Sequence, residues 1–152
     1  MLAEVKEATA RGCEGQPLMP GVEALLLDAR ARGLGRAVAS SSSCGWVDGW
    51  LRRHGIRDLL DVVVARDDVR RTKPDPELFL LAASRLGVEP GACVVFEDSP
   101  NGMRAAVAAG MRCVAVLNAL TRSLPRPDVD LVLESLAERS LAQVLASLVS
   151  AS

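Results

Sequence analysis

The strongest constraint on the fold is the stretch at residues 94–106, where an apolar run passes directly into two carboxylates and then a proline. Residues 94–96, Val-Val-Phe, form a short apolar run typical of a buried strand. Pro100 stands where the first turn of a helix tolerates proline, because the N–H that it lacks would be unpaired there. Ser99 is a suitable N-cap, and the alanines that follow favour helix. The stretch therefore predicts a buried strand, an acidic tip and a returning helix.

Glu97 and Asp98 form the acidic tip of this predicted strand. In parallel α/β sheets, ligands bind beyond the carboxyl ends of the strands, which is where both carboxylates would lie. Two adjacent carboxylates repel each other unless a cation lies near them, and oxygen ligands on a short turn suit Mg²⁺. A solvated acidic turn that caps the next helix fits the pair at least as well, so the pair alone does not establish a metal site.

Short apolar runs alternate with amphipathic helical stretches along the rest of the chain. Strands are predicted around residues 37–39, 62–64, 94–96, 112–117 and 131–133, and helices at residues 2–11, 20–33, 44–54, 77–86, 100–110 and 136–148. This alternation predicts a right-handed, parallel α/β sheet flanked by helices. A chain of 152 residues is long enough for one real core, and it contains no internal repeat and no second full domain.

Composition argues against several classes of partner. The net charge of −1 gives no strong positive potential that would attract nucleic acid or an anionic membrane. The chain has only two Phe, two Trp and no Tyr, which are too few for a surface on which bases stack. No run approaches the ~20 apolar residues of a membrane span. Cys13, Cys44, Cys93 and Cys113 lack CxxC spacing and are expected to be buried thiols. We therefore expect a cytoplasmic protein without nucleic-acid or membrane partners.

Two further features fall beside predicted strand ends. Ser40 ends a strand before a helix, and its hydroxyl, with the free N–H groups of Ser41 and Ser42, would bind a phosphate oxygen. Lys73 precedes Pro74, which favours an extended backbone, and its ammonium would neutralise a phosphate or a carboxylate. A flexible serine linker and a solvated lysine are the simpler interpretations of each feature alone. Together with the acidic tip, these residues predict a phosphate and Mg²⁺ site on one face of the sheet.

Three stretches carry these residues in order along the chain. They are Val-Ala-Ser-Ser-Ser at residues 38–42, Thr-Lys-Pro-Asp-Pro-Glu at residues 72–77 and Val-Phe-Glu-Asp-Ser-Pro-Asn-Gly at residues 95–102. Their order and spacing resemble the haloacid dehalogenase-type (HAD) hydrolase superfamily, in its β-phosphoglucomutase-like phosphatase branch. The resemblance covers about residues 17–148 and implies an α/β fold, a three-layer Rossmann-like HAD core with a parallel sheet flanked by helices.

The resemblance also implies a role for each residue of the predicted site. Ser40 and Ser41 would bind the transferring phosphate, and Lys73 would neutralise it, so that Ser40 and Lys73 form the catalytic set. Asp98 would ligate Mg²⁺, with Glu97 beside it in a supporting role in the metal site. The implied activity is the Mg²⁺-dependent hydrolysis, or phosphomutase-like transfer, of a small phosphorylated metabolite such as a sugar phosphate.

One part of the family pattern is missing from the sequence. The family's nucleophile lies in an N-terminal DxDx(T/V) motif on the first, central strand, and nothing before Ser40 fits it. Asp28 falls in a predicted helix, and Asp128 and Asp130 have the DxD spacing only in the tail region. Because phosphoryl transfer needs a positioned nucleophile, we expect the chain alone to have little or no turnover.

The cap domain of the family is largely missing too. Residues 2–12 resemble its last helix, so we divide the chain into a cap remnant with its link at residues 1–16 and a partial HAD core at residues 17–152. The sequence thus resembles a truncated HAD protein that starts about two-fifths of the way along the family pattern.

In the family, the missing first strand lies between the strand that ends at Ser40 and the strand that ends at Asp98. Its removal would leave these two about 9.6 Å apart, twice the ~4.8 Å strand spacing, with unpaired N–H and C=O groups on facing edges. Each buried unpaired group costs about 1–3 kcal/mol. We therefore expect the two strands to pair directly, or a homodimer to cover the edges, and residues 2–6 are a further candidate to fill the gap.

Two other functional interpretations stay open. Without its nucleophile, the chain would be a non-catalytic phosphate-binding or interaction module, or a fragment of a longer HAD protein. A receiver-like signalling domain also combines carboxylates, a hydroxyl and a lysine. It fits poorly, because receivers carry their acidic pair after the first strand.

Overall fold

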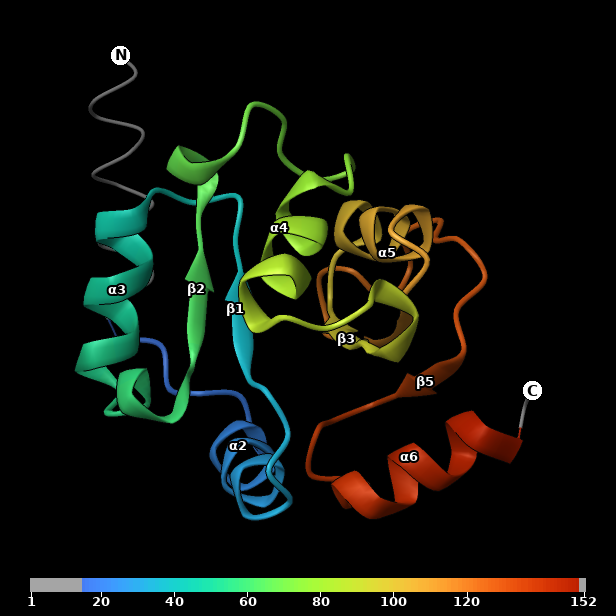
Figure 1. Ribbon diagram of the computed structural model, residues 1–152. Coiled ribbons are helices and arrows are strands. Elements are labelled where there is room, and N and C mark those ends of the chain that lie inside the picture. Colours follow the sequence, from blue (N-terminus) through green and yellow to red (C-terminus); the bar gives the residue numbers. More distant parts are fainter. Residues whose placement is uncertain (1–14, 151–152) are drawn as a thin grey trace.

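A computed structural model describes residues 15–150 of the chain (Figure 1). Helices and strands alternate, which confirms the predicted α/β class with parallel strands flanked by helices. The elements are α2 (Val22–Ala31), β1 (Ala37–Ala39), α3 (Cys44–Arg53), η1 (Arg57–Leu59), β2 (Val62–Val64), η2 (Arg66–Asp68), α4 (Glu77–Leu86), η3 (Pro90–Ala92), β3 (Val94–Glu97), α5 (Pro100–Ala108), β4 (Arg112–Val116), β5 (Leu131–Leu133) and α6 (Leu141–Ser150). The proposed cap remnant at residues 2–12 lies outside the described residues.

The strands form two parallel sheets rather than one. β1 pairs with β2, with Val38 opposite Val63. The second sheet has the order β3-β4-β5, with Val95 opposite Cys113. β1 and β3 are neighbours in neither sheet, so the expected direct pairing of these two strands is wrong. The two sheets are instead joined by helices that pack on both of them.

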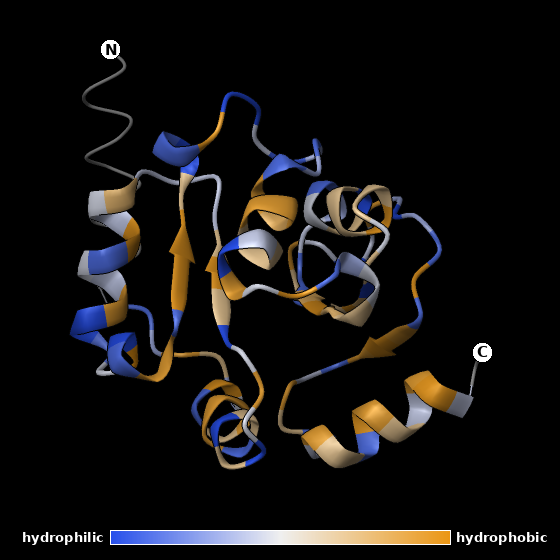
Figure 2. Ribbon diagram, in the orientation of Figure 1, coloured by the Kyte–Doolittle hydropathy of each residue, from blue (hydrophilic) through white to orange (hydrophobic). Residues whose placement is uncertain are grey.

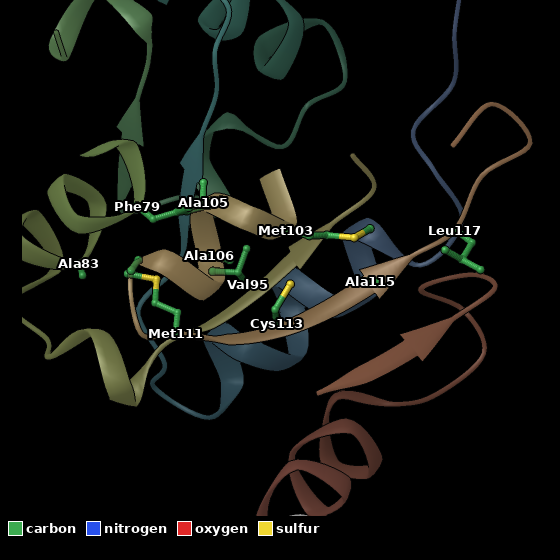
Figure 3. Close-up of a cluster of buried hydrophobic side chains, with 11 residues drawn as sticks. Phe79, Ala83, Val95, Met103, Ala105, Ala106, Met111, Cys113, Ala115 and Leu117 are labelled. Atoms are coloured by element: carbon green, nitrogen blue, oxygen red, sulfur yellow. The ribbon is translucent and has the colours of Figure 1, made fainter. Parts of the chain in front are cut away.

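Helix α4 joins the sheets on one side. Its Leu78 packs with Val64 of β2, while Phe79, one residue further, packs in the cluster that contains Val95 of β3 and Ala105 of α5. Figure 3 shows this second cluster, in which side chains of α4, α5, β3 and β4 meet. Because both halves of the chain bury apolar side chains against α4, this helix holds the sheets together without any backbone pairing between them.

Helices α2, α3 and α6 cover the opposite side. Leu26 of α2 and Leu51 of α3 pack with Val38 of β1, and Val144 of α6 packs with Phe96 of β3. The hydropathy colours of Figure 2 follow this arrangement, with apolar residues on the strands and on the inner parts of the helices. The core is therefore divided by layer and by sheet into several clusters.

Helices α2 and α6 meet where the chain enters α2. Gly21 has a φ of 92° and lies against the segment that leads into α6. A Cβ built on Gly21 would be 2.5 Å from the carbonyl carbon of Leu136. Glycine is required here both for the left-handed backbone and for the close contact.

The last helix begins later than the sequence suggested. We expected a helix from residue 136, but α6 starts at Leu141. The Ser140 N–H donates to Gln143 Oε1 at 2.9 Å, and the Gln143 N–H donates to Ser140 Oγ at 3.3 Å. This reciprocal capping box, Ser-x-x-Gln, sets the start of the helix and was overlooked in the sequence.

The cysteines differ in their exposure. Cys113 is fully buried in β4 and Cys93 is half-buried, but Cys44 is exposed at the start of α3, so the expectation of a buried thiol is wrong for Cys44. Cys13 lies outside the described residues. Within residues 15–150, no helix has both the length and the apolar character needed to cross a bilayer.

Candidate functional site

The predicted site residues follow the carboxyl ends of β1, β2 and β3. The first two strands end together, because the Ser40 N–H donates to the Val64 carbonyl at 2.9 Å. The loop after β2 carries Lys73, whose Nζ forms an ion pair with Oε1 of Glu97, the last residue of β3. This ion pair links the loop after the first sheet to the carboxyl end of the second sheet, so Lys73 and the acidic tip, two parts of the predicted site, are in contact.

The serine turn after β1 is closed by a local hydrogen bond. The Ser42 N–H donates to Ser40 Oγ at 3.1 Å, so this N–H is not free, contrary to our expectation. Ser41 is exposed. Because Ser40 Oγ acts as the acceptor in this bond, its own proton is left for an acceptor such as a phosphate oxygen.

The N-terminus of α3 already holds a carboxylate of the chain itself. Oδ2 of Asp67, in the loop after β2, accepts the Cys44 N–H at 2.5 Å. Asp67 thus caps α3 from a position 23 residues further along the chain. The negative charge at this helix start reduces its attraction for a second anion.

The ammonium of Lys73 contacts two neighbouring groups. Its side chain is 13% exposed, and Nζ lies 4.7 Å from the centroid of the Phe79 ring as well as against Glu97. A cis peptide bond joins Lys73 to Pro74. The ring face and the carboxylate both attract the ammonium and fix its position.

Glu97 turns its carboxylate toward the start of α5. Its Oε2 accepts the Ser99 N–H at 3.3 Å and the Ser99 hydroxyl at 3.1 Å, while Oε1 pairs with Lys73. Ser99 Oγ in turn accepts the Gly102 N–H at 3.0 Å, which confirms Ser99 as the predicted N-cap. Both oxygens of Glu97 are therefore engaged by groups of the chain, and this carboxylate acts as an anchor for the ammonium.

Asp98 faces a different partner. Its Oδ2 accepts a hydrogen bond from Asn118 Nδ2 at 3.0 Å, and Asn118 Oδ1 accepts the N–H groups of Leu120 and Thr121 at 2.9 Å each. Sequence reasoning missed Asn118. The signal was available, since Asn118 is a polar residue that directly follows the apolar run of β4, at the same sheet edge as Asp98.

The donors fit Mg²⁺ only in part. Mg²⁺ takes about six oxygen ligands and commonly keeps several waters beside one or two carboxylates and substrate phosphates. Asp98 offers Oδ1, to which no hydrogen bond is made by residues 15–150, whereas Glu97 is committed to Lys73 and Ser99. Across the described part of the chain, no three His, Cys, Asp or Glu side chains are grouped to hold a metal. Water and substrate oxygens would have to complete the site.

Two other acidic residues that the sequence singled out, Asp28 and Asp130, have structural partners. Asp130, of the DxD pair in the tail, accepts the Cys113 N–H at 2.7 Å and pairs with Arg112 at 3.0 Å, which ties β5 to β4. Asp28 pairs with Arg32 on the surface of α2. Neither carboxylate is free to act as the nucleophile that the family pattern requires.

A surface cleft of about 600 Å³ lies beside the Lys73 loop rather than over the site. Its lining consists of Asp68, Arg71, Asp75, Pro76, Glu77, Leu80 and Leu81. The hydrogen bonds that Glu77 accepts from the Arg70 and Arg71 N–H groups lower the pKa of its carboxyl. The cleft contains none of Ser40, Lys73 and Asp98, so we assign it no part in phosphate binding.

Comparisons with known proteins agree with the fold and with the family that the sequence resembles. The haloacid dehalogenase-like hydrolase family matches residues 3–110. YhcW of Bacillus subtilis, which bears the name of a phosphatase, is 48% identical over 140 residues, which is 92% of this chain and 64% of that protein. CbbY from Rhodobacter sphaeroides, solved in complex with phosphate, has a TM-score of 0.79 and 38% identity, over 86% of this chain and 60% of CbbY.

A second solved structure comes from the branch that the motifs resemble. The β-phosphoglucomutase of Clostridium difficile has a TM-score of 0.76 and 27% identity, over 87% of this chain and 56% of that protein. The chain thus spans less than two thirds of the length of these relatives. Because the family matches residues 3–110, which is most of the chain, the chain belongs to the haloacid dehalogenase-like hydrolase family.

Proposed function

We propose that this chain is the phosphate- and metal-binding part of a HAD-type phosphatase that acts on a small phosphorylated sugar. The observation that carries the proposal is the ion pair of Lys73 and Glu97, which brings a fixed ammonium to the strand ends beside Asp98. The likeness to a protein solved with phosphate and to a β-phosphoglucomutase supports the substrate class.

Each residue of the site has a defined task in this proposal. Lys73 neutralises the phosphate, the hydroxyl of Ser40 and the N–H of Ser41 donate to its oxygens, and Asp98 provides the carboxylate for Mg²⁺. When bound, Mg²⁺ would supply further positive charge beside the phosphate oxygens. Glu97 supports the metal site indirectly, by holding Lys73 in place.

The chain alone is proposed to turn over little or no substrate. At the end of β3, Glu97 is paired with Lys73, and Asp98, which accepts a hydrogen bond from Asn118, is assigned to Mg²⁺, so neither serves as the nucleophile in this proposal. We interpret residues 17–152 as a partial HAD core and residues 1–16 as a cap remnant and link. We place the protein in the cytoplasm, in keeping with free thiols at Cys44, Cys93 and Cys113.

The test measures phosphate binding and turnover separately. Hydrolysis of p-nitrophenyl phosphate with Mg²⁺ is compared for the wild type and Asp98→Ala, and binding of inorganic phosphate is followed by titration calorimetry with and without Mg²⁺. Asp128→Ala, an exposed acid outside the site, is the matched control. We expect background turnover in all three proteins, and Mg²⁺-dependent phosphate binding that Asp98→Ala alone abolishes. Mg²⁺-dependent turnover that is lost in Asp98→Ala would show that the chain is an active enzyme.

The second candidate is a non-catalytic phosphate-binding or interaction module. The edges of β1 and β3 favour it, because no strand within residues 15–150 pairs with them and unpaired strand edges are sites of association. A homodimer that pairs the outer edges of β2 or β5 belongs to this candidate. Sedimentation velocity over a range of concentrations tests it, and a constant monomer mass would exclude the homodimer.

A further inference from the structure

The backbone of Asn118 is held from both sides, just beyond the carboxyl end of β4. The residue before it, Leu117, is still paired with the neighbouring strand, because its N–H donates to the Leu133 carbonyl at 2.9 Å. The Asn118 carbonyl accepts the Arg122 N–H at 3.0 Å, which closes a turn at residues 118–122. The sheet and the turn together fix the place from which the Asn118 side chain extends.

The side-chain amide of Asn118 has one favoured orientation. Its Oδ1 accepts the N–H groups of Leu120 and Thr121, at 2.9 Å each. An amide oxygen only accepts and an amide nitrogen only donates, so a half-turn of the amide would set donor against donor in the turn and acceptor against acceptor at Asp98. The turn therefore directs the Nδ2 donor at Asp98, with a distance of 3.0 Å to Oδ2.

This donor distinguishes the two oxygens of Asp98. Oδ2 accepts from Asn118, whereas no group within residues 15–150 donates to Oδ1. The backbone of Asp98 is placed by the sheet, since the preceding residue, Glu97, pairs in register with Ala115 of β4. Of the three staggered χ1 rotamers that an aspartate can adopt, the hydrogen bond stabilises the one that brings Oδ2 to the amide. Asp98 thus has a fixed backbone and a fixed rotamer.

Mg²⁺ and Ca²⁺ make different demands on such a carboxylate. Mg²⁺ requires near-octahedral geometry at short distances and is usually bound by one or two carboxylates together with waters. Ca²⁺ takes about six to eight oxygen ligands in flexible geometry and often binds both oxygens of one carboxylate. If both oxygens of Asp98 turned to one cation, the hydrogen bond at Oδ2 would be lost. The bond therefore favours binding through Oδ1 alone, which is the mode that suits Mg²⁺.

We propose that Asn118 is a positioning residue of the metal site, whose amide holds Asp98 so that one oxygen is offered to the cation and Mg²⁺ is favoured over Ca²⁺. The proposal rests on the function proposed above, in which Asp98 binds Mg²⁺. Groups that hydrogen-bond to a ligating side chain orient it, and their loss typically costs about 10–100-fold in metal affinity. Asn118 acts in this way through Asp98, without contact to the cation.

Two substitutions at Asn118 separate the donor from the turn. Asn118→Ser and Asn118→Asp both keep an oxygen that accepts N–H groups further along the chain, as serine and aspartate do in turns. Serine is too short to reach Asp98, and aspartate presents an acceptor to it instead of a donor. The matched control is Asn101→Ser at the other asparagine of the chain, which is exposed and accepts a hydrogen bond from Arg104.

The first measurement needs no cation. NMR couplings across χ1 of Asp98 are recorded for the full chain after divalent cations are removed with a chelator. We expect one rotamer in the wild type and in Asn101→Ser, and averaging over rotamers in both Asn118 variants. Slow amide exchange at Leu120 and Thr121 shows that the turn is intact.

Two results of this measurement would overturn the proposal. A single Asp98 rotamer in both Asn118 variants would mean that the amide does not fix the carboxylate. Loss of the turn in both variants would assign Asn118 to the turn alone. If only one variant loses the turn, the rotamer in the other decides.

The second measurement titrates Mg²⁺ and Ca²⁺ separately and follows the amide signals around Asp98. Asp98→Ala identifies the signals that report a cation at this carboxylate. We expect the Mg²⁺ affinity of Asn118→Ser to fall by about tenfold and its Ca²⁺ affinity to fall less, so that the preference shifts towards Ca²⁺. Asn101→Ser should match the wild type for both cations.

The titrations distinguish a failure of this proposal from a failure of the proposed function. Equal ratios of Mg²⁺ to Ca²⁺ affinity in the wild type and in Asn118→Ser, with binding that Asp98→Ala abolishes, would overturn the role of Asn118 and leave the metal site intact. Absence of cation binding at Asp98 in the wild type would refute the metal site, and the role of Asn118 with it.

Discussion

The carboxylate of Glu97 occupies the space that a side chain at Gly102 would fill, since a Cβ built on Gly102 would lie 2.0 Å from Glu97 Cδ. Gly102 is thus required for its small volume, at a helix position where it has no positive φ. We expect Gly102→Ala to displace Glu97 from Lys73 and Ser99, and to lower the free energy of unfolding by about 1–3 kcal/mol, in the range of overpacked cores. Urea denaturation measures the change.

Gly49→Ala is the matched control for this substitution. Gly49 lies within α3, and a Cβ there would meet no atom within 4 Å. We expect the change to stabilise the protein by about 0.5–1 kcal/mol, because alanine favours helix. Equal effects of the two substitutions would contradict the close contact between Glu97 and Gly102.

A second prediction concerns the ion pair of Lys73 and Glu97, whose side chains are 13% and 9% exposed. Lys73→Met leaves the Glu97 carboxylate without its cation and should cost about 3–5 kcal/mol of stability, as for broken buried pairs. The double variant Lys73→Met/Glu97→Gln should lose less than the sum of the two single changes, which a double-mutant cycle measures.

The surface pair of Arg122 and Glu134 provides the comparison. Both of its side chains are 58% exposed. Because exposed ion pairs contribute about 0–1 kcal/mol, Arg122→Met should hardly change the denaturation midpoint. A larger loss there than in Lys73→Met would mean that the buried pair does not hold the two sheets together.

A third prediction follows from the capping box of α6. Ser140→Ala removes the acceptor of the Gln143 N–H and should cost about 0.5–2 kcal/mol. Thermal unfolding followed by circular dichroism measures the loss. Ser123→Ala, at an exposed position in the loop after β4, is expected to be neutral, and a similar loss in both variants would argue against the cap.

A fourth prediction concerns alkaline pH. Burial, with the negative charges of Glu97 and Asp130, raises the pKa of the Cys113 thiol from 9.0 to about 12. A group whose pKa is higher in the folded state contributes its stability in full below the unfolded pKa. We therefore expect this contribution to be lost as the pH rises from about 9 towards 12, and Cys113→Ala to flatten that part of the pH profile of the unfolding free energy. An unchanged slope in this variant would exclude Cys113 as the cause.

A fifth prediction distinguishes the thiols by their accessibility. Cys44 is exposed and Cys113 is buried, so iodoacetamide near pH 8 should alkylate Cys44 and leave Cys113 unmodified. Mass spectrometry of the digested protein identifies the labelled sites. In urea, both thiols should react. Rapid labelling of Cys113 without denaturant would contradict its burial in β4.

Local signals made most elements predictable from the sequence. The strand Val62–Val64 is a run of valines between turn residues, and Glu77–Leu86 has the apolar spacing of a helix before a glycine, so both were predicted at their observed positions. Ser99 was likewise identified as a cap because the signal lies within a few residues. The capping box at Ser140 was equally local and was simply overlooked.

Contacts between distant residues were harder to predict. Asn118 binds Asp98 across 20 residues, and Asp67 caps α3 across 23. The place of Asn118 after an apolar run indicates the sheet edge, but the partner of neither residue can be found from local spacing. The sequence predicted that Lys73 lies near the acidic tip. It did not reveal that the Lys73 ammonium pairs with Glu97 rather than remaining free for a phosphate.

The pairing of β1 with β3 was predicted wrongly for an energetic reason. We counted the cost of unpaired backbone groups but not the apolar surface that Leu78 and Phe79 of α4 bury on both sheets. Helix packing fixes the separation of the sheets, and the edges of β1 and β3 stay unpaired within the described chain.

Each of the two sheets is drawn from one uninterrupted stretch of chain, residues 37–64 for the first and residues 94–133 for the second. All strand pairings therefore close short loops between sequential neighbours, which is the condition for rapid formation. During synthesis, the amino-terminal sheet can assemble on the ribosome before the carboxyl-terminal one has been translated. Helix α4, which lies between the two sheets in the sequence and packs on both, is then expected to join the two halves.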